Sequence, residues 1–139
     1  MKGMIMKVTL WIASAFVFGV LFGHLTIPAA NAQFRTVKTS RLLTTDLGGW
    51  CDGKEVTVEH IEAGPGTSGK HYHPAHSFTY VLQGSESYAL DGGPSKMVHA
   101  GDVLHESPMQ LHTANNPSTV KLLVIRVIEK GQKDTVRVP

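Results

Sequence analysis

The sequence predicts an all-β domain, a barrel or sandwich built from short strands. Segments rich in β-branched and aromatic residues recur at short spacing, and turn-forming Gly, Pro, Asn and Asp residues separate them. No helical period is sustained along residues 33–139. With 139 residues and a hydrophobic content of 42%, the chain has the size and composition of one globular domain.

Residues 1–32 are expected to form a signal peptide ahead of that domain. Lys2 and Lys7 precede an apolar run over residues 8–27, and Ala30-Asn31-Ala32 has the A-x-A pattern of a cleavage site. The alternative is an uncleaved anchor, because the apolar run is almost long enough to span a membrane. In both cases the domain is expected to be exported, to the periplasm or to the outside. Cleavage would leave it without stable membrane association.

The charge of the mature segment argues against a nucleic-acid partner. Removal of Lys2 and Lys7 lowers the number of Lys and Arg residues from 13 to 11, which equals the 11 Asp and Glu residues. The net charge is then zero with neutral histidines, and no basic cluster remains to follow a phosphate backbone. Cys51 is the only cysteine, so no intramolecular disulfide can form, and we assign it no function.

The first predicted strands are bounded by turn residues. Residues 55–61 alternate polar and apolar side chains, as a half-buried strand does, and the Gly- and Pro-rich stretch 64–69 ends this strand. Residues 78–82 are β-branched or aromatic except for Leu82, and therefore predict the next strand. Residues 85–90 and 95–98 flank Asp91-Gly92-Gly93-Pro94, which predicts a β-hairpin.

Two further strands are expected near the end of the chain. Residues 111–114 precede the turn Asn115-Asn116-Pro117-Ser118. Residues 120–128 are apolar except for Lys121 and Arg126, a pattern that predicts a strand buried on both faces.

Three histidines in these strand-like segments predict a transition-metal site. His71 and His73 stand on alternate residues, so both point to one side of an extended segment, and His112 comes from a different strand. Neutral imidazole binds Fe, Cu, Zn and Ni, and three histidines with an open coordination position form a known catalytic arrangement. The three residues are therefore expected to bind a divalent transition metal. The alternative is a polar cluster that holds no metal.

The residues around these histidines resemble the two motifs of the cupin superfamily. His71-Tyr72-His73 matches the paired histidines of the first motif and Gly84 its closing glycine, while Gly101, His112 and Asn116 match the second motif. The similarity covers about residues 40–131 of a single domain at 33–139. It implies a cupin-type double-stranded β-helix, which is a jelly-roll barrel. It also implies a small-molecule ligand. The implied activity is that of an isomerase or of an oxygenase of the dioxygenase type.

One departure from the first motif concerns the fourth metal ligand. The cupin motif has a glutamate with six residues between it and the closing glycine, and this position is Ser77 here. Two residues are candidates for a further ligand or for a proton-transfer group: Glu106, upstream of His112, and His76, next to Ser77. Because the glutamate is replaced, a non-catalytic module that binds a small ligand is the alternative to an enzyme.

Strand alternation predicts the two faces of the segment after His73. If Ser77 points into the barrel, Thr79 and Val81 do so as well. The side chains between them then face outward: Phe78, Tyr80 and Leu82. Outward apolar side chains favour a homodimer, as the resemblance to single-domain cupins also implies, or a cover provided by the N-terminal segment.

Overall fold

The computed structural model describes residues 33–139, and the predicted signal peptide lies outside this part of the chain. The described residues form strands joined by short turns, with one short 3-10 helix, η1 (Gly48–Trp50). The strands are β1 (Val37–Asp46), β2 (Lys54–Ala63), β3 (Gly66–Thr67), β4 (His71–Tyr72), β5 (His76–Gln83), β6 (Ser85–Leu90), β7 (Ser95–His99), β8 (Val103–Glu106), β9 (His112–Asn116), β10 (Val120–Glu129) and β11 (Val136–Arg137).

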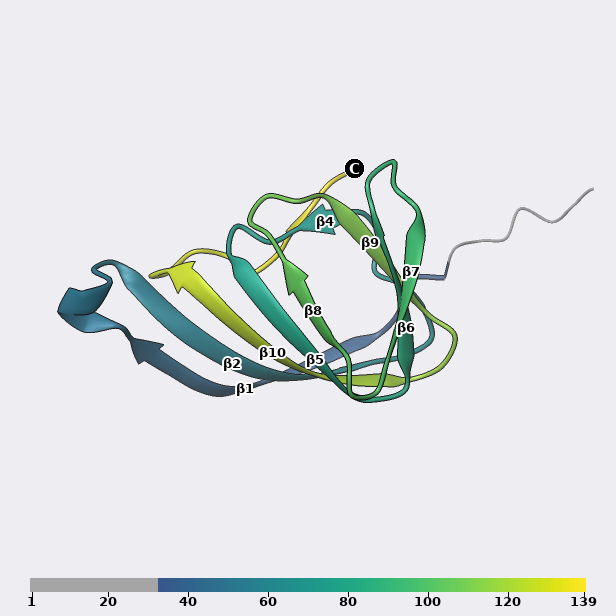
Figure 1. Cartoon of the computed structure of the whole chain (residues 1–139), viewed down its shortest axis with the longest axis horizontal. Coiled ribbons are helices and arrows are strands. Elements are labelled where there is room, and N and C mark those ends of the chain that lie inside the picture. The colour runs from purple at the N-terminus through teal and green to yellow at the C-terminus, as the bar shows by residue number, and fades with distance from the viewer. Residues whose placement is uncertain (1–32) are drawn as a thin grey trace, which may run out of the picture.

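The strands pair into two antiparallel sheets that enclose a common interior (Figure 1). One sheet has the order β1-β2-β10-β5-β8, and the other contains β11-β4-β9-β6-β7, with β3 paired to β9. Neighbours in each sheet are mostly distant in sequence, as in a jelly roll. The predicted all-β jelly-roll barrel is confirmed. Among the described residues, no helix is long and apolar enough to cross a membrane.

The predicted hairpin is also confirmed, since β6 and β7 pair antiparallel with Ser85 opposite His99. The prediction for the last long strand was wrong in one respect. Residues 120–129 alternate between buried and partly exposed positions, so β10 is covered on its inner face only. Arg126 lies on the buried face and Ile125 on the outer face, where it is 38% exposed. The barrel interior therefore contains the charged side chain of Arg126, which the largely apolar sequence of this strand does not predict.

Gly84, the closing glycine of the first motif, occupies a position that no other residue fits well. Its φ of +84° lies in the left-handed region, which favours glycine. A Cβ at this position would lie 2.7 Å from the carbonyl oxygen of Thr119. The glycine therefore lets the turn between β5 and β6 pass close to the start of β10.

The inner faces of the two sheets divide into an apolar part and a polar part. The apolar part is a cluster of small aliphatic side chains, which are Ala63, Val81, Val98, Val120, Leu122 and Val124. Ser77 and Thr79 are buried as alternation predicts, while Phe78 and Tyr80 are 42% and 41% exposed. The polar part of the interior lies beside the aliphatic cluster and holds the predicted histidines.

Candidate metal centre

The three predicted histidines lie together inside the barrel. His71 is on β4 and is the direct cross-strand partner of His112 on β9, and His73 follows β4 by one residue. One ring nitrogen from each of the three lies within 4.8 Å of the others, and all three side chains are buried. Two hydrogen-bonded strands thus bring His112 to the same point as His71 and His73, which lie 41 and 39 positions before it in the sequence.

The backbone fixes which nitrogen of each ring points to the common centre. The Nδ1 of His71 lies 2.9 Å from the Gly69 carbonyl oxygen, and the Nδ1 of His112 lies 2.8 Å from that of Gln110. His73 Nδ1 is 2.7 Å from the Asp134 carbonyl oxygen. A carbonyl only accepts, so each Nδ1 carries the proton and each Nε2 presents a lone pair. This is the tautomer that a metal-binding histidine needs.

Burial keeps these imidazoles neutral at physiological pH. It lowers the pKa of His71 from 6.5 to about 4, against the opposing effect of its hydrogen bond to Gly69. It lowers the pKa of His73 to about 3, with the positive charge of Arg126 as the next contribution. The pKa of His112 is lowered for the same main reason. Neutral imidazole is the metal-binding form, so no proton has to leave before an ion can bind.

Glu106 completes the group from the neighbouring sheet. Its Oε1 is 3.3 Å from His112 Nε2 and its Oε2 is 3.6 Å from His73 Nε2. Glu106 ends β8, where its cross-strand partner on β5 is Ser77. A carboxylate is therefore present one strand away from the position at which the cupin motif has its glutamate. Burial raises the pKa of Glu106 from 4.5 to about 7, although the charge of Arg126 opposes this rise.

The chemistry of this cluster fits a cation. Three Nε2 lone pairs and the oxygens of Glu106 face one another, and a carboxylate has no proton to donate once it is ionised. Acceptors that face acceptors in a buried site are unfavourable unless a proton or a cation lies between them. Imidazole nitrogen with one carboxylate suits a divalent transition metal. The residues present therefore fit the group that the sequence predicts.

The structure does not bring His76 to this centre. His76 precedes the inward-facing Ser77 by one residue, so its side chain lies on the outer face of β5 and is exposed. Its Nδ1 is 3.0 Å from the Nε2 of His105, another exposed residue, on β8. His76 is therefore not placed to be a fourth ligand of the triad.

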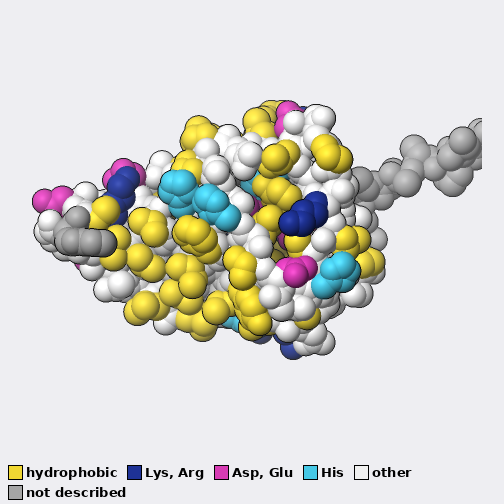
Figure 2. Space-filling view, viewed as in Figure 1, with side chains coloured by type: hydrophobic (Ala, Val, Ile, Leu, Met, Phe, Trp, Pro, Cys, Tyr) yellow, Lys and Arg dark blue, Asp and Glu magenta, His cyan; other side chains and the backbone are white. Residues whose placement is uncertain are grey.

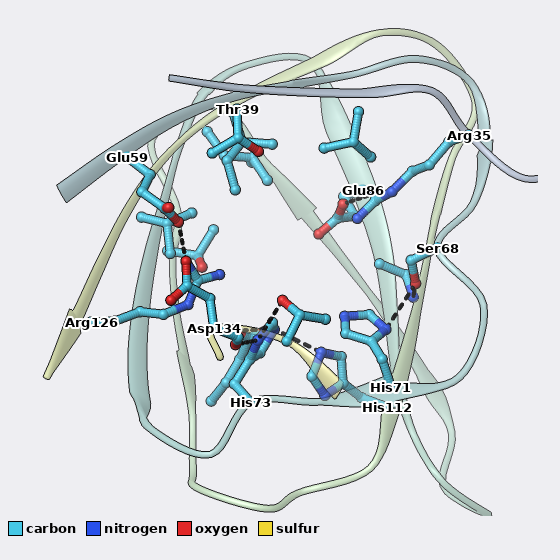
Figure 3. Close-up of a pocket in the computed structure, with 18 of the residues that line it drawn as sticks. Arg35, Thr39, Glu59, Ser68, His71, His73, Glu86, His112, Arg126 and Asp134 are labelled. Carbon is cyan, nitrogen blue, oxygen red and sulfur yellow. Dashed lines mark hydrogen bonds and ion pairs between the residues drawn. The ribbon is translucent and has the colours of Figure 1, made fainter. Parts of the chain in front are cut away.

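A cavity of about 170 Å³ opens beside the histidines. This volume is below the roughly 300–1,000 Å³ of sites for drug-sized ligands, so the cavity suits a small molecule. Its walls carry two ion pairs, Arg126 with Glu59 and Arg35 with Glu86. Figure 3 shows these pairs on opposite walls, with the three histidines at one end of the space between them.

Sequence reasoning missed these charged residues of the cavity. Arg126 stood out as the single arginine in an apolar strand, and this signal could have placed it in a functional interior. Its Nε is 3.2 Å from the Oγ of Ser77, so the guanidinium extends over the position left free by the absent glutamate. Arg35 and Glu86 carried no comparable signal in the sequence.

The shifted pKa values predict how the stability of the metal-free protein depends on pH. Between about pH 4 and 6.5, His71 and His73 are protonated in the unfolded chain and neutral in the folded one, so the free energy of unfolding increases with pH. Glu106 acts in the opposite direction between 4.5 and about 7, because the folded protein keeps its proton there. We expect the stability to increase up to about pH 6.5 and then to decline slightly.

Urea unfolding after chelator treatment, at several pH values across this range, measures the profile. The variant Glu106→Gln should lose the decline above about pH 6.5 and show a steeper increase below it, since only the histidine contribution remains. A variant profile that overlays that of the unmodified protein would contradict the assignment.

Comparison with known proteins places this site in a family. Residues 57–127, which include the triad and Glu106, match the family model of the cupin domain. The chain belongs to the cupin family. The match confirms the resemblance predicted from the two motifs. A comparison with curated proteins finds no match.

Several solved structures have the same fold as this chain. A cupin-like protein from Thermotoga maritima is 22% identical, with 76% of this chain and 79% of that chain covered and a TM-score of 0.58. The polyketide cyclase RemF from Streptomyces resistomycificus is 21% identical over 74% and 72% of the two chains, with a TM-score of 0.56. The DMSP lyase DddQ from Ruegeria pomeroyi is 15% identical, with a TM-score of 0.59. The match covers 73% of this chain and 51% of the lyase chain.

Proposed function

We propose that this cupin binds one divalent transition metal through His71, His73 and His112 and acts on a small organic molecule in the adjoining cavity. The observation that carries the proposal is the common orientation of three Nε2 lone pairs, each set by a hydrogen bond from Nδ1 to a backbone carbonyl. Iron, copper, zinc and nickel are all compatible with this donor set.

The residues of the cavity supply the remaining functions. A bound metal would act as a Lewis acid or bind a reactant at its open positions. Glu106 faces two of the histidines and is either a fourth ligand or a proton-transfer group, and a pKa of about 7 suits proton transfer at neutral pH. The ion pairs of Arg126 and Arg35 line the walls against which a small substrate would be oriented.

The reaction type that we favour is oxygenase-like or isomerase-like, as the cupin resemblance implies. Structures with the same fold include a polyketide cyclase and DMSP lyases, so the fold supports several reactions on small molecules. A non-catalytic ligand-binding module is the second candidate, because Ser77 replaces the glutamate of the motif. Oxygen uptake or turnover with candidate phenols, thiols or diketones would favour the enzyme. Thermal shifts with these compounds and no turnover would favour the binding module.

Element-resolved metal analysis of protein purified without added metal tests the proposal. We expect close to one equivalent of a transition metal in the unmodified protein and almost none in the double variant His71→Ala/His112→Ala. His99→Ala is the matched control, because the side chain of His99 is 67% exposed and lies outside the cluster. The absence of metal from the unmodified protein, or equal metal contents in all three proteins, would refute the proposal.

We also propose that the protein is exported after cleavage of residues 1–32. Support comes from the sequence alone, namely the basic start, the apolar run and the Ala-Asn-Ala site. Mass spectrometry of protein recovered from the periplasm or the medium should find Gln33 as the first residue. Retention of the leader in a membrane fraction would support the anchor instead.

A homodimer through the outer face of the β1-β2-β10-β5-β8 sheet is the expected assembly. Hydrophobic side chains gather over these strands (Figure 2). Exposed hydrophobic residues of these strands include Leu43, Phe78, Tyr80, Leu82, Val103 and Ile125. A contiguous apolar patch on a soluble domain usually marks an interaction site, and an uncharged patch can pair with its own copy.

Light scattering during size-exclusion chromatography tests this assembly. We expect the mass of a dimer for the unmodified protein and that of a monomer for Tyr80→Glu, because the new carboxylate would be buried without a partner. Met97→Glu is the control, since Met97 is similarly exposed, at 46%, but lies on the other sheet. A monomeric unmodified protein would rule out the dimer.

A further inference from the structure

Two histidines on the outside of the barrel form a second cluster of imidazole side chains. His76 is at the start of β5 and His105 is on the adjacent strand β8, and both are exposed on the outer face of the sheet. The Nδ1 of His76 is 3.0 Å from the Nε2 of His105. A pair of adjoining histidines is visible beside the hydrophobic patch in Figure 2. Ser77 and Glu106, which follow them in sequence, point to the interior, so the pair is on the opposite side of the sheet from the buried triad.

The surrounding residues hold the two rings in place. Antiparallel pairing of β5 with β8 places Phe78 directly opposite His105. The two rings stack with their centroids 4.9 Å apart and an angle of 15° between planes. The His76 and His105 rings are also nearly parallel, at 17°. Two neighbouring strands and one aromatic contact therefore preorganise the facing nitrogens, so little side-chain entropy is lost if both bind the same ion.

The spacing of the facing nitrogens suits chelation. With metal–nitrogen bonds of about 2.0–2.1 Å, two nitrogens 3.0 Å apart subtend roughly a right angle at the ion. A right angle is the angle between adjacent ligands in the tetragonal geometry of Cu(II) and Ni(II), and Cu(II) is the most strongly bound of the divalent first-row ions. Each neutral ring carries one proton. In the hydrogen bond between the rings, one of the two facing nitrogens carries the proton. An ion that replaces this bond requires that ring to adopt its other tautomer, with the proton on the outer nitrogen (Nε2 of His76 or Nδ1 of His105), and no proton is released to solvent.

We propose that His76 and His105 form a second, surface metal site that binds one Cu(II) or Ni(II) ion through His76 Nδ1 and His105 Nε2. Two protein ligands leave the other coordination positions open to water or to a ligand from another molecule. In a monomer, an ion held in this way is more accessible to exchange than one in the buried triad. In the proposed dimer the second copy would lie beside it, because Phe78, which stacks on His105, belongs to the apolar patch of that face. The site is independent of the cavity function, because it shares no ligand with the triad.

Equilibrium dialysis of the full chain against Cu(II), which measures the number of ions bound per chain, tests this site. We expect two equivalents of Cu(II) per unmodified chain and one equivalent in each of the single variants His76→Gln and His105→Gln. His99→Gln is the matched control, since it removes an exposed histidine of the other sheet, and it should retain two equivalents. Electron paramagnetic resonance of the surface-bound copper should show coupling to two nitrogens.

A variant without the triad separates the two sites. With Cu(II) added, His71→Ala/His112→Ala should retain the one equivalent that His76→Gln removes, whereas the same variant purified without added metal should hold almost none, because two ligands do not retain the ion through purification. If the unmodified protein binds a single equivalent that is lost only with the triad, the surface site is refuted and the buried site stands. If the single equivalent is lost only on changing His76 or His105, the surface site stands and the buried site fails. Equal losses in the His76 and His99 variants would also refute the surface site, because they would indicate non-specific binding to exposed histidines.

Discussion

Replacement of Arg126 by methionine is expected to lower the free energy of unfolding by about 3 kcal/mol, the lower end of the range for breaking a buried ion pair. Arg126 and Glu59 are 4% and 3% exposed, so the substitution leaves a carboxylate buried beside an apolar side chain. The loss stays at the lower end because Arg41 Nη2 still contacts Glu59 at 2.9 Å. Urea denaturation at neutral pH measures the change.

A double variant provides the control for this effect. Glu59→Leu/Arg126→Met removes both charges together, and replacing a buried pair by apolar residues is often neutral for stability. We therefore expect the double variant to be more stable than Arg126→Met alone. If the double variant is the less stable of the two, packing rather than the uncompensated charge accounts for the loss.

Glu106→Gln is expected to weaken metal binding by roughly 10–100-fold, the range for groups that support metal-binding histidines. Glutamine has nearly the same volume as glutamate but presents one oxygen without the negative charge. The three histidines and their carbonyl partners remain, so binding should weaken rather than disappear. Competition with a coloured chelator measures the affinity, and Glu62→Gln is the control because Glu62 is exposed on β2.

Moving the carboxylate across the strand pair tests its position more directly. Ser77 and Glu106 are cross-strand partners, so Ser77→Glu/Glu106→Ser places a carboxylate at the position that the cupin motif uses. We expect this exchange to recover part of the affinity that Glu106→Ser loses. For the single variant Glu106→Gln, a metal affinity equal to that of the unmodified protein would show that the carboxylate does not contribute to metal binding.

Local periodicity was enough to predict the faces of the strands and the histidine cluster. Alternation correctly placed Ser77 and Thr79 inside the barrel and Phe78 outside it, because the period of an extended strand is set by backbone geometry. The two spaced motifs brought His112 to the other histidines without any knowledge of the pairing. The same alternation could have placed His76 outside, since it immediately precedes Ser77.

Long-range register is what the sequence could not predict. Glu106 reaches the centre because β8 pairs with β5 at Ser77, and no local pattern specifies that alignment. The position of Arg126 in the interior also depends on strand register, since it lies opposite Ser77 through the pairing of β10 with β5. Each pairing is decided by packing of the whole sheet rather than by local preference. The sequence alone therefore does not predict which charged residues line the cavity.

The hydrogen bond from His73 to Asp134 ties this ligand to a short strand at the edge of the barrel. Asp134 lies two residues before β11, a strand of two residues that, within residues 33–139, pairs only with β4. Short peripheral segments open locally far more often than the sheets they border. A brief detachment of this edge would leave His73 free to rotate while both sheets stay paired, so amide exchange near residue 136 should report how often the centre loses its alignment.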